Sequence, residues 1–309
     1  MTRLLLLGDL HLSTTGPPLP TACPDLESLD VDAIVSIGDI VDDNTDHADD
    51  TTAGKKYERR GRAFFDRLND VGVPVVAVPG NHDPVDCTRR LTDGLDNVVV
   101  AHRHVIDGST TDQHALDQIR FVGWGCEQFD LTPAFAYDQY AGIVPELSTV
   151  GSVTQTATRV ATTVESVIGR FLAGALDPLE AATELGVEPD QRDSCADALA
   201  VLEAEFDAIV EVLAGESETT VLLAHESPFH VDFDHHHSDD GLRGRLHRGS
   251  VPLKMAIAAS SPNVVFSGHM HVEGRDVIET TAGYADLYNP GSPGVAIVEI
   301  EDGSLVDVS

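Results

Sequence analysis

The stretch "VPVVAVPGNHDPVD", residues 73–86, joins a short apolar run to three polar residues without any transition. A run of small branched residues such as 73–78 is typical of a β-strand that is buried on both faces of a sheet. Gly80 ends this run, and Asn81, His82 and Asp83 follow it directly. Binding sites of α/β proteins lie beyond the carboxyl ends of parallel strands, so this pattern predicts a strand that ends at a functional site.

Four other short apolar runs end in a polar turn in the same way. They are residues 4–7 before "GDLH", 33–37 before "GDIVDD", 220–223 before "AHES" and 264–266 before "GHMH". Between the second and third strands, Phe64, Leu68 and Val71 recur at helical spacing, which predicts an amphipathic helix over about 55–71 that Gly72 closes. Strands that alternate with a helix, with polar loops at the strand ends, indicate an α/β fold.

The middle of the chain differs from its two ends. Residues 97–100 and 119–123 read as further strands, and the last residues read as a hairpin that turns at 301–303. Residues 127–218 have little β-character and carry two segments of helical periodicity. We expect a core of residues 1–126 and 219–309, with 127–218 as a helical insertion or cap; the alternative is that these helices belong to the core layers.

The chain is strongly acidic, with 52 Asp and Glu residues against 19 Lys and Arg in 309 residues and a net charge of −33. Such a surface is typical of proteins from halophilic organisms, in which high salt screens the self-repulsion. An acidic protein of an ordinary cytoplasm is the alternative. In either case the field repels nucleic acid and anionic membranes at low salt.

Cysteine usage and hydropathy bear on the cellular compartment of the protein. The four cysteines are widely spaced, without a C-x-x-C pair, which argues against a zinc ribbon or a disulfide framework and favours a reducing cytoplasm. The apolar run at the N-terminus is too short for a signal peptide, and no run approaches the ~18 apolar residues of a membrane span.

The polar side chains that follow the five strands are oxygen and nitrogen donors. Because the ends of parallel strands meet at one edge of a sheet, we expect these side chains to converge. Such donors suit Mn, Fe, Zn or Ni, and seven potential ligands are too many for one tetrahedral zinc but fit two metals that share a carboxylate. The convergent set is Asp9, His11, Asp39, Asn81, His82, His225, His269 and His271.

Each motif alone carries little weight. With 14 His in the chain, an H-x-H pair arises by chance roughly 0.6 times, and 102–104 and 235–237 match it as well as 269–271 does. The order of five such motifs is far more specific. "GDLH", "GDIVDD", "GNHD", "AHES" and "GHMH", in this order, resemble the calcineurin-like metallophosphoesterase superfamily.

This resemblance covers the expected core and not the helical insertion. It implies a metallo-dependent phosphatase-like, four-layer α/β/β/α sandwich with a dinuclear metal site. It also implies ligand roles by motif position. Asp9, His11 and His271 hold the first metal, Asp39 bridges, and Asn81, His225 and His269 complete the second, while His82 lies just outside the metals.

The chemistry of phosphate esters fits these roles. Two cations neutralise the charge that repels a nucleophile, and a bridging water supplies hydroxide near neutral pH. His82 can stabilise the developing charge or protonate the leaving oxygen, and it contacts substrate together with Asn81. Either Asp83 or Asp42 can orient the imidazole of His82, and Asp42 is therefore a second catalytic candidate.

Residues 230–249 are rich in His, Asp and Arg and follow His225 closely. One interpretation is a substrate-facing loop in which Arg243, Arg245 or Arg248 grips a phosphate. The other is an exposed mobile loop without a function.

The sequence therefore predicts a cytoplasmic hydrolase of phosphate monoesters or diesters that uses two divalent ions, Mn²⁺ first among Fe, Zn and Ni, with a metal-bridging hydroxide as nucleophile. One alternative is a DNA exonuclease or endonuclease that resembles the double-strand-break repair nucleases. It should show a basic groove, which this sequence lacks, so nucleic acid is the less favoured partner. The other alternative is a non-catalytic scaffold, which usually lacks a ligand residue.

Overall fold

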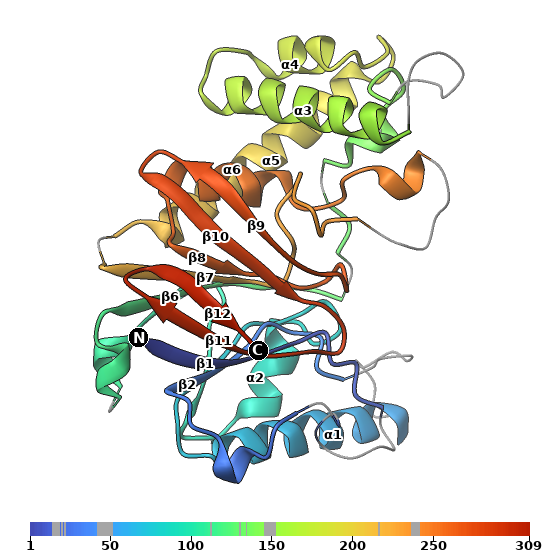
Figure 1. Ribbon diagram of the computed structural model, residues 1–309. Helices are drawn as coiled ribbons and strands as arrows, with labels where there is room; N and C mark the ends of the chain where they lie inside the picture. The colour runs from blue at the N-terminus through green and yellow to red at the C-terminus, as the bar shows by residue number, and fades with distance from the viewer. Residues whose placement is uncertain are drawn as a thin grey trace.

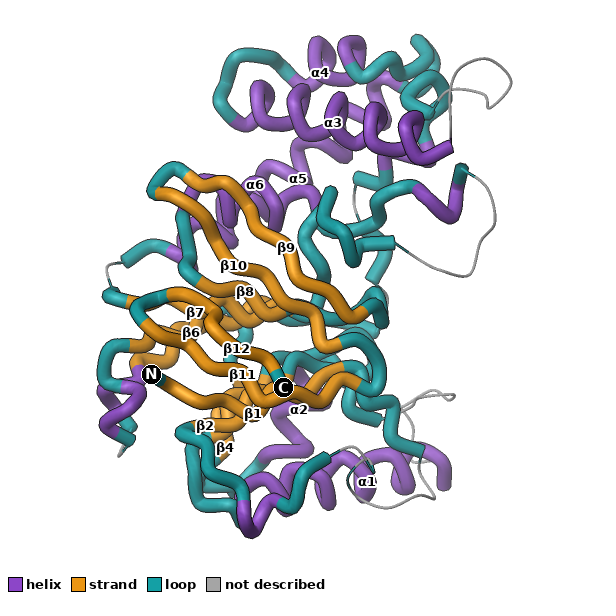
Figure 2. The backbone as a smooth tube through the Cα atoms, viewed as in Figure 1, coloured by secondary structure: helices purple, strands orange, loops and turns teal. Residues whose placement is uncertain are grey.

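The computed structural model shows two stacked β-sheets with helices on both outer faces, and a group of helices at one end (Figures 1 and 2). The structure describes residues 1–13, 19, 21, 23–41, 52–111, 113–129, 131–133, 135–144, 153–215, 217–235 and 242–309. The described helices include none that is long and apolar enough to cross a membrane.

The first sheet has the strand order β12-β11-β1-β2-β3-β4. Strands β1 to β4 run parallel. At the side of β1, β11 pairs antiparallel with β1, and β12 pairs antiparallel with β11. The strands are β1 (Thr2–Gly8), β2 (Ala33–Ser36), β3 (Val75–Ala77), β4 (Val98–Val100), β11 (Gly294–Glu301) and β12 (Ser304–Val308).

The second sheet has the order β5-β6-β7-β8-β10-β9. Its four central strands are parallel, and an antiparallel strand lies at each side. The strands are β5 (His104–Asp107), β6 (Ile119–Trp124), β7 (Thr219–Ala224), β8 (Val264–Phe266), β9 (Glu273–Thr280) and β10 (Gly283–Pro290).

Three apolar clusters hold four layers together. Side chains such as Leu6 and Phe266 fill the space between the two sheets. Helices α1 (Thr52–Asn69) and α2 (Val85–Thr92) cover the outer face of the first sheet, with Phe64 among the buried residues there. On the second sheet, α5 (Arg192–Leu213) and α6 (Val251–Ser260) cover the outer face. The α/β/β/α sandwich expected from the sequence is confirmed.

A fourth apolar cluster lies in the helical segment between β6 and β7. It joins α3 (Val153–Leu172), α4 (Pro178–Glu184) and the first half of α5 to residues after β7, such as Phe229 and Leu246. In Figure 1, α3 and α4 lie beyond the sandwich, and α5 runs from them to the second sheet. Short 3₁₀ turns complete the described elements, at Leu26–Ser28, Gly108–Thr110, His114–Leu116, Tyr137–Gln139 and Arg243–Arg245.

The predicted helix over 55–71 and the five strands that precede the polar motifs are present, with bounds that shift by at most three residues. The terminal hairpin is also confirmed, because Glu301 pairs with Ser304 across a turn in which Asp302 and Gly303 have positive φ. Strands β5, β9 and β10 were not predicted. Strands β5 and β9 lie at the sides of the second sheet and expose much of their length, so their sequences lack a continuous apolar run.

Candidate metal centre

Strand ends from both sheets deliver the expected polar side chains to one place. The first sheet contributes the residues after β1, β2 and β3, and the second sheet those after β7 and β8. His, Asp and Glu side chains within mutual reach of one ion form two groups here: Asp9, His11, Asp39 and His271, and Asp39, His225 and His269.

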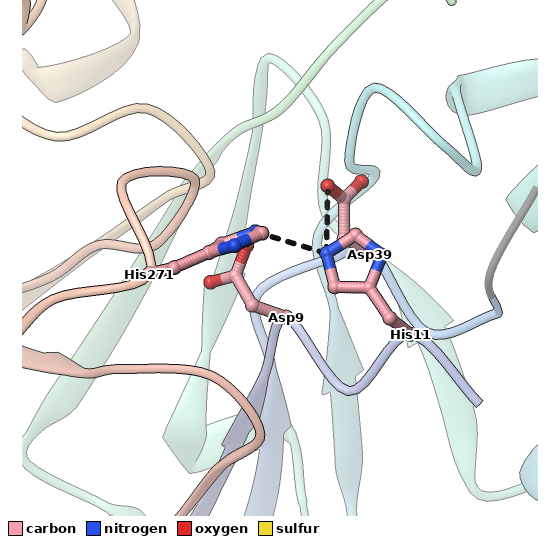
Figure 3. A group of neighbouring side chains, drawn as sticks. All are labelled: Asp9, His11, Asp39 and His271. Carbon is pink, nitrogen blue, oxygen red and sulfur yellow. Dashed lines mark hydrogen bonds and ion pairs between the residues drawn. The ribbon is translucent and has the colours of Figure 1, made fainter. Parts of the chain in front are cut away.

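The first group lies at the ends of β1, β2 and β8 (Figure 3). The Nε2 atoms of His11 and His271 are 3.0 Å apart, and Asp9 Oδ1 lies 3.5 Å from His271 Nε2. Two nitrogens that each lie about 2.1 Å from one ion, at a right angle, are about 3 Å apart. The separation of the two imidazole nitrogens therefore fits a shared ion.

The second group is organised around the imidazole of His225. His225 Nδ1 lies 2.8 Å from the carbonyl oxygen of Ile37, so this nitrogen must carry the proton. Its Nε2 faces Asn81 Oδ1 at 2.9 Å, and His269 Nδ1 lies 3.0 Å from the same oxygen. In neutral His225 this contact sets a lone pair against a carbonyl oxygen. The contact is therefore favourable only with a proton or a cation between them.

Asp39 connects the two groups. Its Oδ2 lies 3.4 Å from His225 Nε2 and 3.8 Å from His11 Nε2, and Figure 3 shows its carboxylate beside the His11 ring. Its other oxygen accepts a hydrogen bond from the backbone N–H of His82 at 2.7 Å. One carboxylate oxygen within reach of both groups suits a pair of ions, and hard oxygen and imidazole donors suit divalent first-row metals.

His82 lies beside this centre. Its ring packs edge-on against the ring of His11 with centroids 4.9 Å apart. Its carbonyl oxygen accepts a hydrogen bond of 2.6 Å from the Tyr57 hydroxyl of α1, and its N–H binds Asp39. The backbone of His82 is thus fixed on both sides, and its partly exposed side chain borders the first group.

The loops that carry these side chains have backbone conformations of unfavourable free energy. Asp9, His11, Asp39, His269 and His271 all have φ between 42° and 68°. Non-glycine residues in this region cost about 1–3 kcal/mol each, although Asp and His tolerate it better than most. Such strain persists only where surrounding contacts fix the backbone.

Two glycines permit the close approach of these loops. A Cβ on Gly80 would lie 2.2 Å from Asp39 Oδ1, and one on Gly268 would lie 2.3 Å from Asp9 Oδ2. Neither position has room for a side chain, so the glycine of each motif is needed where the carboxylate passes.

The suggestion that Asp83 orients the His82 ring is wrong. The Asp83 carboxylate is buried and accepts hydrogen bonds from the backbone N–H groups of Asp39, Gly80 and Ile40, at 2.8, 3.0 and 3.2 Å. It therefore ties the loop after β2 to the loop after β3, which bear two of the expected ligands. The alternative orienter, Asp42, lies outside the described residues.

The structure also shows positioning residues whose partners the sequence does not reveal. The backbone N–H of His269 donates to both oxygens of Asp9, at 2.9 and 3.0 Å. Buried Asn289, at the end of β10, donates to Ser227 Oγ and to the Gly268 carbonyl, while Ser227 donates to the same carbonyl. The only sequence signal for this network is the turn "NPGSPG" at 289–294, which does not reveal its partners.

The centre holds several charges away from water. Burial raises the pKa of Asp9 to about 7, against the attraction of His225 and with a further rise from Asp39. Burial also tends to raise the pKa of Asp39, but the positive charge of His225 outweighs this effect and holds the pKa of Asp39 below its usual range. Burial lowers the pKa of His225, but Asp39 overcomes this and raises it to about 10. In the metal-free chain Asp39 and His225 therefore form an ion pair.

A cavity of about 800 Å³ adjoins the centre at His269 and Met270. It extends between Trp124 and α5, where Leu202 and Glu205 line it. Further lining residues that bear on its chemistry are Arg103, Cys126, Tyr137, Asp138, Glu226, His247 and Arg248.

The stretch 230–249 forms part of this region. Its described residues are mostly buried, Phe233, Asp234 and His247 among them, so the interpretation as an exposed loop is wrong for that part. Arg245 is exposed and does not line the cavity, whereas Arg248 does. The side chain of Arg243 lies outside the described residues. Phosphate contacts by Arg243 and Arg245 stay predictions.

With this geometry established, residues 2–157 match the calcineurin-like phosphoesterase family. The chain belongs to this family. The match covers the first three motifs and the start of the helical segment, and the two remaining motifs lie beyond it. No curated protein matches the chain.

One solved structure supports the fold. One crystal structure aligns with the whole of this chain and 98% of its own, with a TM-score of 0.53 and 14% identity, which supports a shared fold alone. The sulfate thiohydrolase SoxB of Thermus thermophilus, in complex with glycerol, aligns with 90% of this chain and 38% of its own, at 12% identity and a TM-score of 0.34. Membership of the family and the Asp/His groups support a metal-dependent phosphoesterase.

Removal of the Asp83 carboxylate should loosen the centre. Asp83→Ala leaves three backbone donors without their acceptor, which costs about 1–3 kcal/mol for each donor that stays buried. We expect a lower free energy of unfolding and weaker metal binding, by urea titration and metal titration. Asp86→Ala, whose side chain is 85% exposed, is the control and should change neither. Equal stability of the two variants would contradict the role of Asp83.

Metal binding should strengthen as pH rises. The raised pKa of Asp9 means that the folded, metal-free chain holds this proton up to about pH 7. The proton therefore stabilises the metal-free fold below about pH 4, and this contribution is lost as pH rises towards 7. A metal needs the carboxylate form.

Metal affinity of the apoprotein should consequently rise from about pH 5 to about pH 7, as titration calorimetry at several pH values would show. Asp9→Asn should bind less tightly and lose part of this pH dependence. Because the proton on His225 adds a rise of its own up to about pH 10, the test is the difference between the two chains. The same pH dependence in Asp9→Asn as in the parent would refute the assignment of a protonated Asp9.

Proposed function

We propose that the chain is a hydrolase of phosphate monoesters or diesters that acts with two divalent ions, Mn²⁺ in the first place. The observation that carries the proposal is the Asp39 carboxylate, one oxygen of which lies within 3.4 and 3.8 Å of His225 and His11 from the two sheets. When bound, two such ions neutralise the charge of a phosphate ester and lower the pKa of an attacking water.

The residues present fit this pair of ions. Asp9, His11 and His271 would hold one, Asn81, His225 and His269 the other, and Asp39 would contact both. The carbonyl oxygen of Asn81 adds a neutral donor, which leaves the pair with net positive charge for an anionic substrate. The hydrogen bond from His225 to the Ile37 carbonyl fixes the tautomer that presents Nε2.

His82 would handle the proton of the leaving group. Its imidazole borders the first group without belonging to it, and its backbone is fixed through Tyr57 and Asp39. A general acid must lie within reach of the leaving oxygen, and an imidazole titrates near the working pH. Asn81 and His82 would also contact the phosphate directly.

The cavity beside the centre supports a substrate with an organic group. A volume of about 800 Å³ is in the range of small-molecule sites. Its far wall is α5, so residues 127–218 would form a cap over the core of 1–126 and 219–309. Arg248 at the rim could contact an anionic part of the substrate, although Asp138 lies 3.9 Å from it.

The charge favours a small ester over DNA. Carboxylates outnumber cations in the chain, 52 to 19, and the cavity itself contains Glu127, Asp138, Glu205 and Glu226. A DNA-binding groove should be positive. The four free cysteines and the acidic composition support a reducing, salt-rich cytoplasm as the working environment.

Turnover of model esters tests the proposal. We expect the Mn²⁺-loaded chain in high salt to hydrolyse p-nitrophenyl phosphate or its bis-ester, and EDTA to abolish this. Asp39→Ala should lose both activity and bound metal, because both groups share this carboxylate. Absence of turnover on both esters, together with cleavage of linear duplex DNA, would favour the nuclease instead, and inactivity on all three would favour a scaffold.

His82→Ala should separate chemistry from metal binding. Since His82 lies outside both ligand groups, metal content should stay near that of the parent, while turnover falls by roughly 10²–10⁴. His114→Ala is a matched control, because that side chain is 99% exposed. Unchanged turnover in His82→Ala would exclude the general-acid role, and loss of metal would place His82 among the ligands.

A further inference from the structure

A third group of metal-ligating side chains lies away from the dinuclear centre. Asp234, His235 and His247 each offer a ligand atom, and these atoms lie within 4.8 Å of one another, the same bound that holds for the two groups of the dinuclear centre. All three belong to the segment between β7 and α6, which leaves the sandwich at His225 and returns at Ser250. No step of the proposed hydrolysis uses them.

Asp234 contacts several other residues of this segment through its carboxylate. The carboxylate is fully buried, and no Lys or Arg is paired with it among the described residues. Its Oδ2 accepts hydrogen bonds from the backbone N–H groups of His230 and Gly249, at 2.8 and 3.2 Å. Its Oδ1 lies 2.5 Å from His247 Nδ1 and 4.0 Å from His235 Nδ1. One buried anion thus faces two imidazoles.

The imidazoles gather more closely than hydrogen bonding to Asp234 requires. The rings of His235 and His247 have centroids 4.3 Å apart, which is closer than the 4.8 Å of His11 and His271. On the other side of His247, the ring of His230 lies at 4.7 Å, and its Nδ1 contacts Glu165 Oε2 at 2.6 Å. His230 is therefore engaged elsewhere. His247 Nδ1 contacts the Asp234 carboxylate, whereas His235 Nδ1 lies 3.4 Å from the carbonyl oxygen of Leu246 and 4.0 Å from Asp234 Oδ1.

Two basic side chains near this group pair with other carboxylates and not with Asp234. Lys254, the nearest cation of α6, lies 4.0 Å from Glu165 and is paired there. Arg248 points to Asp138. Two imidazolium ions side by side would repel each other, whereas two neutral imidazoles and one carboxylate form a ligand set that borderline divalent ions prefer.

We propose that Asp234, His235 and His247 form a third metal site, of the Zn²⁺ class, that fastens the segment 227–250. An ion there would join residues 234–235 to residue 247, next to the backbone pairs that close the segment, Phe229 to Ser250 and Ser250 to Ser227. Because His247 and Arg248 line the cavity, the site would fix one wall of the substrate region.

The number of bound ions tests the third site. With Zn²⁺ as the probe, the parent chain should bind three ions after dialysis, and His235→Ala should bind two, with at least a tenfold weaker affinity for the last ion. His114→Ala, the exposed control, should bind three. Equal ion counts in His235→Ala and the parent would overturn the proposal.

A second background separates this site from the dinuclear centre. Asp39→Ala should lose the ions of that centre and keep one, and Asp39→Ala/His235→Ala should keep none. Zn²⁺ should slow amide hydrogen exchange at residues 242–250 in the first variant and leave it unchanged in the second. Exchange that responds equally in both would overturn the third site, whatever the outcome for hydrolysis.

Circular dichroism and thermal unfolding in EDTA serve as the folding check. His235 has a side chain 23% exposed, so its truncation should leave the metal-free fold intact. If His235→Ala unfolds in EDTA at the same temperature as the parent but still binds a third ion, the site lies elsewhere and the proposal fails.

Discussion

The buried pair of Asp39 and His225 is the interaction on which the arrangement of the site depends. Asp39 follows β2 of the first sheet and His225 follows β7 of the second, and both side chains are almost completely buried. His225 binds the Ile37 carbonyl through one nitrogen and faces Asp39 with the other, so a single imidazole connects the two sheets at the edge where the site lies. A buried charge pair of this kind is costly unless each partner is well bonded, and both are.

The loops at this edge of the two sheets have strained backbone conformations, and hydrogen bonds between neighbouring loops hold them in place. Five of the proposed ligands have a left-handed backbone, and the loops that bear them are held by bonds such as those from His269 to Asp9 and from Asp39 to Asp83. The glycines of the motifs let these loops approach closely. The site therefore derives its shape from loops fixed by neighbouring loops, and the strands serve to bring them together.

Sequence alone predicts most of the strands and the convergence of the polar side chains, because each of these side chains closely follows a short apolar run. It does not predict contacts between residues that are distant along the chain. The acceptor role of Asp83 joins amides from two strand ends, and Asn289 reaches a loop more than twenty residues away. His235 looks like a chance histidine in sequence, since its partner His247 is twelve positions further on. The exposed strands β5 and β9 escape prediction because they lack an apolar run.

Helix α5 belongs to two apolar clusters at once. Its first half packs with α3 and α4, and its second half packs on the second sheet, while its middle lines the cavity. A helix of 22 residues is a stiff rod about 33 Å long. A tilt of the outer helices would therefore move the middle of α5 and change the shape of the cavity beside the candidate metal centre. Substitutions far from the centre could in this way alter which molecules fit the cavity.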